Sequence, residues 1–267
     1  MSQQLNSLAK AARSVLLTPD ASMKAERTQS MVKAWNAGEI LIVGEPCAPD
    51  IPARPEKPEL LLPRDMPRRR AGGQNANRIA LLHAVAHIEL NAIDLACDII
   101  CRFASTEIPR SFFDDWLKVA TEEAEHFKLI NQRLVDMGSS YGALPAHDGL
   151  WQAAQETAHS LLARLAIVPL VFEARGLDVT PAMIQKFKNS GDVKSAAALT
   201  IIYEEEIGHV ATGMRWYDWQ CQQKGVEPVA TWKSLVAQHF AGNLKPPFNA
   251  GAREQANFPE AYYLMEN

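Results

Sequence analysis

A pattern of glutamate and histidine residues occurs twice in this chain of 267 residues, with nearly the same spacing each time. The two copies are Glu89 followed by Glu123-x-x-His126, and Glu173 followed by Glu206-x-x-His209. The first Glu precedes the Glu-x-x-His by 34 residues in one copy and by 33 in the other. One Glu from each of two helices, plus a Glu-x-x-His from each of two others, is the ligand set of a dinuclear metal site in a helix bundle. The repeat therefore predicts an all-α fold built around a metal centre.

The residues at helical spacing around each of these acids are mainly apolar. Around Glu123, for example, the same helix face carries Trp116, Val119, Phe127 and Ile130. An acid in the middle of such a stripe is expected to face the core. The adjacent acids differ, because Glu122 and Glu125 share a flank with charged residues and are expected to be solvated. The pattern thus selects one inward Glu per helix.

Four buried carboxylates cannot all remain charged unless cations accompany them. Two divalent ions would neutralise them, and the two imidazoles would bind as neutral ligands. A set of carboxylate and imidazole ligands favours iron or manganese; zinc also binds such ligands but is favoured less. We hypothesise that Glu123 and Glu206 bridge the two ions and that Glu89 and Glu173 are terminal ligands. A single Glu-x-x-His is common on helix surfaces, so the prediction depends on the matched repeat.

Length and composition indicate an ordinary globular protein. A chain of 267 residues with 47% hydrophobic residues buries a large core, and we expect one domain over residues 1–267. The net charge of −4 gives no reason to expect nucleic acid or an anionic membrane as partner. The four cysteines form no Cys-x-x-Cys motif, and the N-terminal residues lack the apolar core of a signal peptide. The expected location is the cytoplasm.

The chain divides into segments of different composition. We expect N-terminal helices in residues 1–38, a proline-rich strap over 39–74, a four-helix bundle over 75–225, and a C-terminal helix and tail over 226–267. The bundle helices are predicted at 75–103, 111–137, 151–177 and 192–225. Pro169 is expected to kink the third of these, and Thr180-Pro181 to begin a short separate helix. The kink would open a substrate path or provide a bend that packing requires.

The strap ends in a cluster of basic residues, Arg64 and Arg68 to Arg70. Such a cluster is usually solvated or paired with carboxylates. The alternative is a small anion-binding patch.

Several polar residues are candidates for tuning the metal centre. Asp94 and Asp178 each follow the single Glu of their copy by five residues. That placement suggests acceptors for the second N–H of a ligand histidine, with helix capping or surface charge as the alternative. Tyr203 lies one turn before Glu206 and would hydrogen-bond a ligand, relay an electron, or simply pack in the core. His83 and His87 lie on the flank of the first helix, where they would lie close to the ligands or at the surface; the alternative is that one of them provides a seventh ligand.

The repeat and its helical setting resemble the ferritin-like di-iron carboxylate superfamily over about residues 75–225. The tail Lys245-Pro246-Pro247-Phe248-Asn249 with Ala252-Arg253, and the Arg-Pro run before the bundle, resemble one bacterial branch designated a domain of unknown function. That branch is similar in its metal motif to the tRNA-modifying hydroxylase of the superfamily. The resemblance implies six metal ligands, all present here: Glu89, Glu123, His126, Glu173, Glu206 and His209. It implies no substrate, because one motif serves many reactions.

The expected function is that of a dinuclear-metal oxidoreductase, an oxidase or oxygenase with two iron ions and dioxygen as co-substrate. A manganese–iron or dimanganese pair is the alternative metal content. The reaction would oxidise or hydroxylate a small organic molecule, and an external electron donor would reset the metals. We expect a monomer or homodimer. The competing hypotheses are a ferroxidase or iron-handling ferritin-like protein, and a bundle in which the metal is only structural.

Overall fold

The computed structural model describes residues 7–62, 65–66 and 74–264. Within these residues the chain is helical or irregular and contains no strand, which confirms the all-α class. The chain divides into two compact units, Met1–Trp151 and Gln152–Asn267. The single domain over 1–267 stays a prediction. The basic cluster of Arg64 and Arg68 to Arg70 falls outside the described residues.

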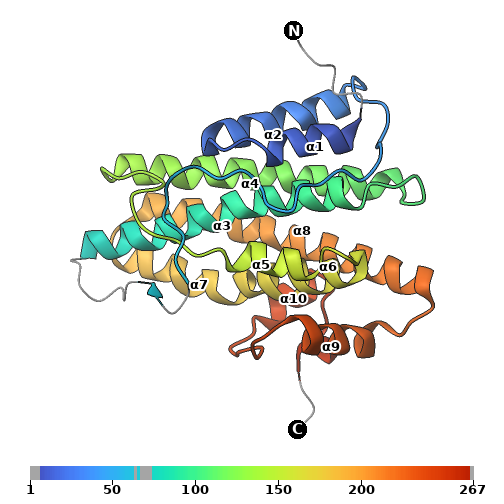
Figure 1. Ribbon diagram of the computed structural model, residues 1–267. Helices are drawn as coiled ribbons and strands as arrows, with labels where there is room; N and C mark the ends of the chain where they lie inside the picture. Colours follow the sequence, from blue (N-terminus) through green and yellow to red (C-terminus); the bar gives the residue numbers. More distant parts are fainter. Residues whose placement is uncertain (1–6, 63–64, 67–73, 265–267) are drawn as a thin grey trace. The chain divides into compact units, whose positions relative to one another are not determined.

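The first unit contains two helical pairs, shown in Figure 1: α1 (Leu8–Leu16) and α2 (Ala21–Asn36), and α3 (Gln74–Arg102) and α4 (Arg110–Asp136). α1 packs against α3, and α2 packs against α4. The side chains of Ser7 and Asp20 cap the first pair by accepting hydrogen bonds from backbone amides of the first turn. The N-terminal helices expected within residues 1–38 are thereby confirmed.

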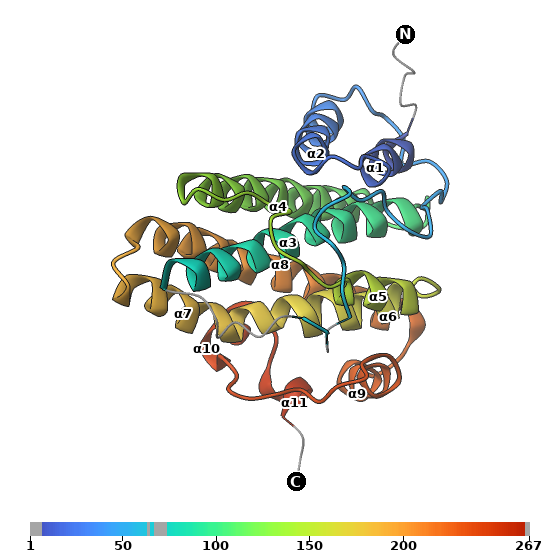
Figure 2. The same ribbon diagram turned by 60° about the vertical axis from the view of Figure 1, so that its left-hand side comes forward.

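α3 and α4 form the hairpin expected over 75–103 and 111–137, within one residue at every boundary. The two helices run side by side in both views (Figures 1 and 2), and Gly138, at a φ of 77°, follows the end of α4. Asn75–Arg102 is long and apolar enough to cross a membrane, by length and composition alone. However, 72% of its most apolar stretch is buried within the protein, as in the core helix of a soluble protein.

The described part of the strap, residues 39–62, is irregular and tied to the helices by its backbone. The amides of Leu8 and Ala9, at the start of α1, donate to the carbonyls of Ile42 and Val43, each at 2.9 Å. These strap carbonyls satisfy helix amides that have no partner within the helix. The described part of the strap contains no helix, as expected for a proline-rich segment, and its extended course stays a prediction.

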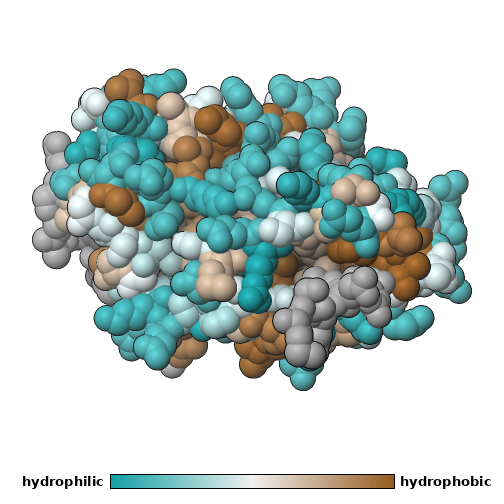
Figure 3. Space-filling view, turned by 90° about the horizontal axis from the view of Figure 1, so that it is seen from above, coloured by the Kyte–Doolittle hydropathy of each residue, from teal (hydrophilic) through white to brown (hydrophobic). Residues whose placement is uncertain are grey.

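The surface drawn in Figure 3 is mainly hydrophilic, with apolar residues scattered among the polar ones. Some of the most exposed large apolar side chains belong to the strap, among them Leu41 (75% exposed) and Ile51 (62%). Ile42, next to Leu41, is also 58% exposed, and exposed apolar side chains of this kind are common on protein surfaces.

The prediction of one continuous third helix over 151–177 is wrong. A turn at 157–160 interrupts the chain, and the Ser160 hydroxyl then caps a new helix by accepting from the Ala163 amide. Beyond it, the helix widens into a π-helical segment that begins beside Pro169. The proline therefore perturbs the helix where a kink was expected. The observed elements are α5 (Gly149–Glu156), α6 (Leu161–Ile167), the π-helix η2 (Val168–Glu173) and α7 (Ala174–Asn189).

The expected helix start at Thr180-Pro181 is also wrong, because α7 continues through Pro181. Proline has no N–H, so the carbonyl of Leu177 lacks its usual helical donor. The side-chain amide of Asn249 donates to that carbonyl at 3.1 Å instead. A contact from the C-terminal tail thus compensates for the lost helical bond, and no local sequence signal could reveal it.

The helix predicted at 192–225 is observed as α8 (Val193–Lys224). Asp192 caps its start, and Gly225, at a φ of 64°, ends it. The C-terminal segment contains the predicted helix and two shorter ones: α9 (Pro228–His239), α10 (Ala250–Gln255) and α11 (Glu260–Tyr263). α9 packs against α6 and α8, and α10 packs against α7 and α8 (Figure 2).

η2 and α8 approach closely where Pro169 faces Gly213. A Cβ atom at Gly213 would lie 2.4 Å from the Cβ of Pro169 and 2.7 Å from its Cγ. Distances this short do not occur between real side chains, so only glycine permits the observed approach of the two backbones.

We expect Gly213→Ala to destabilise the protein. Overpacking costs roughly 1–3 kcal/mol, which outweighs the gain of up to about 1 kcal/mol from replacing a helical glycine. Urea unfolding measures the difference. Gly208→Ala is the matched control, since it lies in the same helix with nothing within 4 Å of the added Cβ, and it should stabilise. Equal stability of the two variants would contradict the close approach.

Candidate metal centre

In the first unit, α3 and α4 bring three of the predicted ligands together. The Nδ1 atom of His126 lies 3.2 Å from Glu89 Oε2 and 3.5 Å from Glu123 Oε2. Each of the three side chains offers a ligand atom, and these atoms lie within 4.8 Å of one another. All three residues are buried, with at most 4% of their surface exposed. The separation and the burial are those of a set that can hold a metal ion.

The hairpin explains why these side chains meet. Glu89 lies 13 residues before the end of α3, and Glu123 lies 13 residues after the start of α4. Because the helices are antiparallel and joined by a short loop, equal distances from the loop place the two acids at the same depth. His126 follows Glu123 by three residues and therefore lies on the same helix face.

The electrostatics of this set favour a cation among the carboxylates. Burial alone would lower the pKa of His126, but hydrogen bonds to Glu123 and Glu89 and the negative charges of both raise it to about 11. Without a metal ion, the ring is therefore held as an imidazolium between two carboxylates. A metal ion would replace that proton, since a histidine ligand must be neutral. The donor set of oxygen and imidazole nitrogen fits iron or manganese.

In the second unit, α8 and η2 carry the other three predicted ligands. Glu206 and His209 lie on α8 with Oε1 and Nδ1 3.6 Å apart, and the His209 side chain is 1% exposed. Glu173 is the last residue of η2 and is half-buried. The close contact of Pro169 with Gly213 lies four residues, about one turn, from both Glu173 and His209. Each unit thus presents one Glu and one Glu-x-x-His, and the role of all six as ligands stays a prediction.

The structure gives Asp94 a different role from the expected one. This fully buried carboxylate pairs with Lys24 of α2 at 2.5 Å and with Arg54 of the strap at 3.1 Å. The predicted acceptor of a histidine N–H is therefore the anion of a buried ion-pair network. The pattern of spacing could not reveal it, because Lys24 and Arg54 are distant in the sequence.

Asp178 is likewise bound by an arginine. Arg253 donates to its two carboxylate oxygens at 3.0 and 2.7 Å, and the backbone amide of Asn249 donates to it at 2.9 Å. The hydroxyl of Tyr203 accepts a hydrogen bond from the side-chain amide of Asn249 at 2.9 Å. Asp178 and Tyr203 therefore both contact the C-terminal tail.

His83 and His87 are buried rather than at the surface, with 1% and 5% of their area exposed. The Nε2 atom of His83 accepts from the amide of Gly142 at 3.0 Å, and His87 Nδ1 lies 2.9 Å from the hydroxyl of Tyr141. Burial, and then the charge of Arg54, lowers the pKa of His87 to about 4. The two rings anchor the segment that follows α4.

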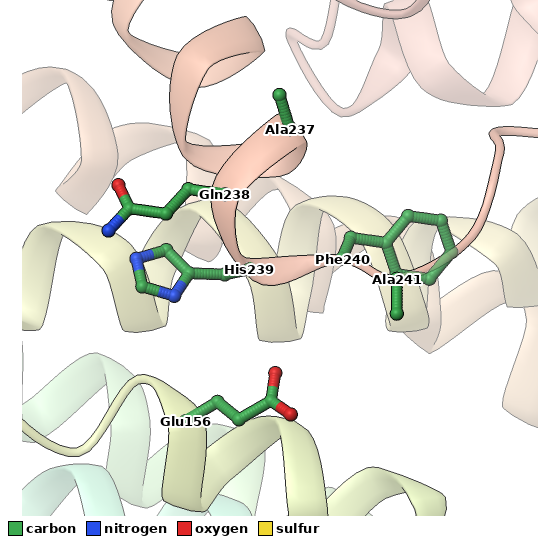
Figure 4. Close-up of a pocket in the computed structure, with 6 residues that line it drawn as sticks. All are labelled: Glu156, Ala237, Gln238, His239, Phe240 and Ala241. Atoms are coloured by element: carbon green, nitrogen blue, oxygen red, sulfur yellow. The ribbon is translucent and has the colours of Figure 1, made fainter.

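The second unit also contains an open hollow of about 430 Å³, shown in Figure 4. It is lined by Glu156 and by residues 237–241, so none of the predicted ligands lines it. The ring of Phe240 at its edge packs against Phe172 of η2, with ring centroids 5.7 Å apart. The hollow therefore adjoins the π-helix without including its glutamate.

We expect Asp94→Asn to destabilise the protein by about 3–5 kcal/mol, because it leaves the buried Lys24 ammonium without its anion. Urea unfolding is the measurement. Lys118→Ala is the control, since it removes the exposed partner of an ion pair with Glu122 in the same unit and should change stability by less than about 1 kcal/mol. If Asp94→Asn lowered the free energy of unfolding no more than the control does, the buried ion-pair network would contribute little to stability.

Comparison with known proteins adds a family and one relative. The model of the family described as "Protein of unknown function (DUF455)" matches residues 17–264. A Haemophilus influenzae protein bearing the name "Uncharacterized protein" is 41% identical over 216 residues, which cover 79% of this chain and 75% of the relative. No solved structure matches the chain.

Proposed function

The chain belongs to the DUF455 family of proteins of unknown function, and we propose that it is a dinuclear-metal oxidoreductase, with iron as the expected metal, that uses dioxygen to oxidise or hydroxylate a small organic substrate. The observation that carries the proposal is the buried set of Glu89, Glu123 and His126, whose ligand atoms lie within 4.8 Å of one another. The same residue types at nearly the same spacing in the second unit support a second ion.

We propose a ferritin-like four-helix bundle for this centre, formed by α3, α4, the segment from α5 to α7, and α8. Each of these four stretches carries a predicted ligand facing apolar neighbours, as the bundle requires. Two divalent ions would match the four carboxylates in charge, and the two imidazoles would complete the donor set. Glu89, Glu123, Glu173 and Glu206 would hold the ions together with His126 and His209.

When bound, two ferrous ions supply the electrons that reduce dioxygen. The protein residues would hold the ions and exclude water. Trp116, Phe127 and Ile130 are buried along the α4 face of Glu123, and Val210 and Met214 are buried beside His209 on α8. Such walls would protect a reactive centre from solvent. His126 would release the proton from Nδ1 as an ion takes its place.

We propose a cytoplasmic monomer or homodimer that receives electrons from an external donor. A net charge of −4 supports neither nucleic acid nor membrane as partner.

The chain should bind two Fe²⁺ ions when loaded anaerobically, as measured by elemental analysis after desalting. Glu123→Gln and Glu206→Gln should each lower the stoichiometry to one ion or fewer, because they remove a carboxylate charge while keeping the side-chain size. Glu125→Gln is the matched control, since Glu125 lies on α4 but is exposed. Two ions retained by Glu123→Gln would contradict the ligand assignment.

The ferrous protein should consume dioxygen faster than free Fe²⁺ at the same concentration, as followed with an oxygen electrode, and Glu123→Gln should lose this acceleration. Sizing of the same sample distinguishes an enzyme from iron storage. A monomer or dimer is expected, whereas a 24-subunit shell would favour storage. Stable metal binding without oxygen consumption would support a structural centre instead.

A further inference from the structure

We propose that Asn249 and Arg253 of the C-terminal tail are positioning residues that fix the backbone at Glu173 and the face of α8 beside Glu206. The inference rests on the proposed function in taking these two glutamates as metal ligands. We call the contacts of Asn249 and Arg253 with α7 and α8 the tail clasp.

Asn249 joins the two ligand-bearing elements through one side-chain amide. Its Nδ2 donates to the carbonyl of Leu177 at 3.1 Å and to the hydroxyl of Tyr203 at 2.9 Å. Leu177 lies four residues after Glu173, and Tyr203 lies three residues before Glu206. One residue of the tail therefore contacts α7 and α8 about one turn from each glutamate.

The contact with Leu177 replaces a hydrogen bond that the helix cannot make. Pro181 occupies the position whose N–H would bind the Leu177 carbonyl, and it has none. On the other side of Glu173, the chain is π-helical from Val168. Glu173 thus lies between two departures from regular α-helix, where helical hydrogen bonding alone holds the backbone less firmly.

Arg253 of α10 binds the N-terminal part of α7. Its Nη2 donates to the carbonyl of Ala174, the residue after Glu173, at 3.3 Å and to Asp178 at 2.7 Å. The guanidinium is 4.4 Å from the ring centre of Tyr263, and the residue is only 3% exposed. A buried arginine with hydrogen bonds to two acceptors has little conformational freedom, so it restrains the carbonyl that it contacts.

Metal affinity depends on such indirect contacts, because mutation of residues that orient a metal ligand typically lowers metal affinity by about 10–100-fold. The residues that the tail clasp contacts on α7, Ala174 and Leu177, lie within four residues of Glu173. The clasp is therefore placed to orient this glutamate. A tail that only stabilised the fold would change the melting temperature without acting through this glutamate.

Asn249→Ser tests the clasp. Serine keeps the cap that the Asn249 side chain provides for α10, but its hydroxyl is too short to reach Leu177 and Tyr203. We expect Co²⁺ titrated into metal-free protein to bind about 10-fold or more weakly than to wild type, with a changed visible spectrum. Tyr217→Phe is the control, since it removes one hydrogen bond of the same unit, to the Pro228 carbonyl, and should leave Co²⁺ affinity within about twofold of wild type.

A double-mutant cycle separates positioning from general loss of structure. In a Glu173→Gln background, Asn249→Ser should cause a smaller fold decrease in Co²⁺ affinity than in wild type, because only its contact with Tyr203, beside Glu206, remains to be lost. The same fold decrease in Co²⁺ affinity in both backgrounds would overturn the proposal. Unchanged Co²⁺ binding by Asn249→Ser would also overturn it. Arg253→Lys, which keeps the charge but not the paired bonds to Asp178, is the second variant and should also weaken Co²⁺ binding only when Glu173 is present.

Hydrogen exchange distinguishes failure of the clasp from failure of the proposed function. In metal-free Asn249→Ser, the backbone amides of residues 174–180 should exchange at least about 10-fold faster than in wild type, while those of α9 should not change. Unchanged exchange would overturn the clasp. Absence of Co²⁺ binding by wild type would overturn the proposed function and, with it, the role of the clasp in positioning ligands.

Discussion

Glu89 and Glu123 bring two carboxylates into the apolar interior of the α3–α4 hairpin, where negative charge is stable only beside positive charge. The imidazole of His126 contacts both. Elsewhere the buried acids are paired with permanent cations: Asp94 with Lys24 and Arg54, and Asp178 with Arg253. This difference separates two kinds of buried acid. A lysine or arginine keeps its proton and fixes the fold, whereas an imidazole can exchange its proton for a metal ion.

Much of the fold follows from local signals in the sequence. The ends of α2 and α8 are set by Asp20, Asp192 and Gly225, whose capping chemistry acts within a few residues. The meeting of Glu89 with Glu123 and His126 follows from helix periodicity and a short loop. These features were predictable because each depends on neighbours in the sequence or on one antiparallel pair.

The features that the sequence did not reveal depend on distant contacts. α7 passes through Pro181, where Asn249 supplies a replacement hydrogen bond from 72 residues beyond Leu177. Asp94 and Asp178 have the spacing of residues that orient a metal ligand, yet their partners come from the strap, α2 and the tail. A symmetric spacing in sequence therefore identified important buried acids but not what binds them.

The two copies of the motif differ in how their glutamates are supported. Glu89 and Glu123 lie within regular helices, so their positions follow from helical geometry. Glu173 ends a π-helix whose approach to α8 requires glycine at position 213 opposite Pro169. Its backbone direction therefore depends on tertiary packing on one side and on the tail clasp on the other. Changes distant from the six predicted ligands should consequently affect the second copy of the motif more than the first.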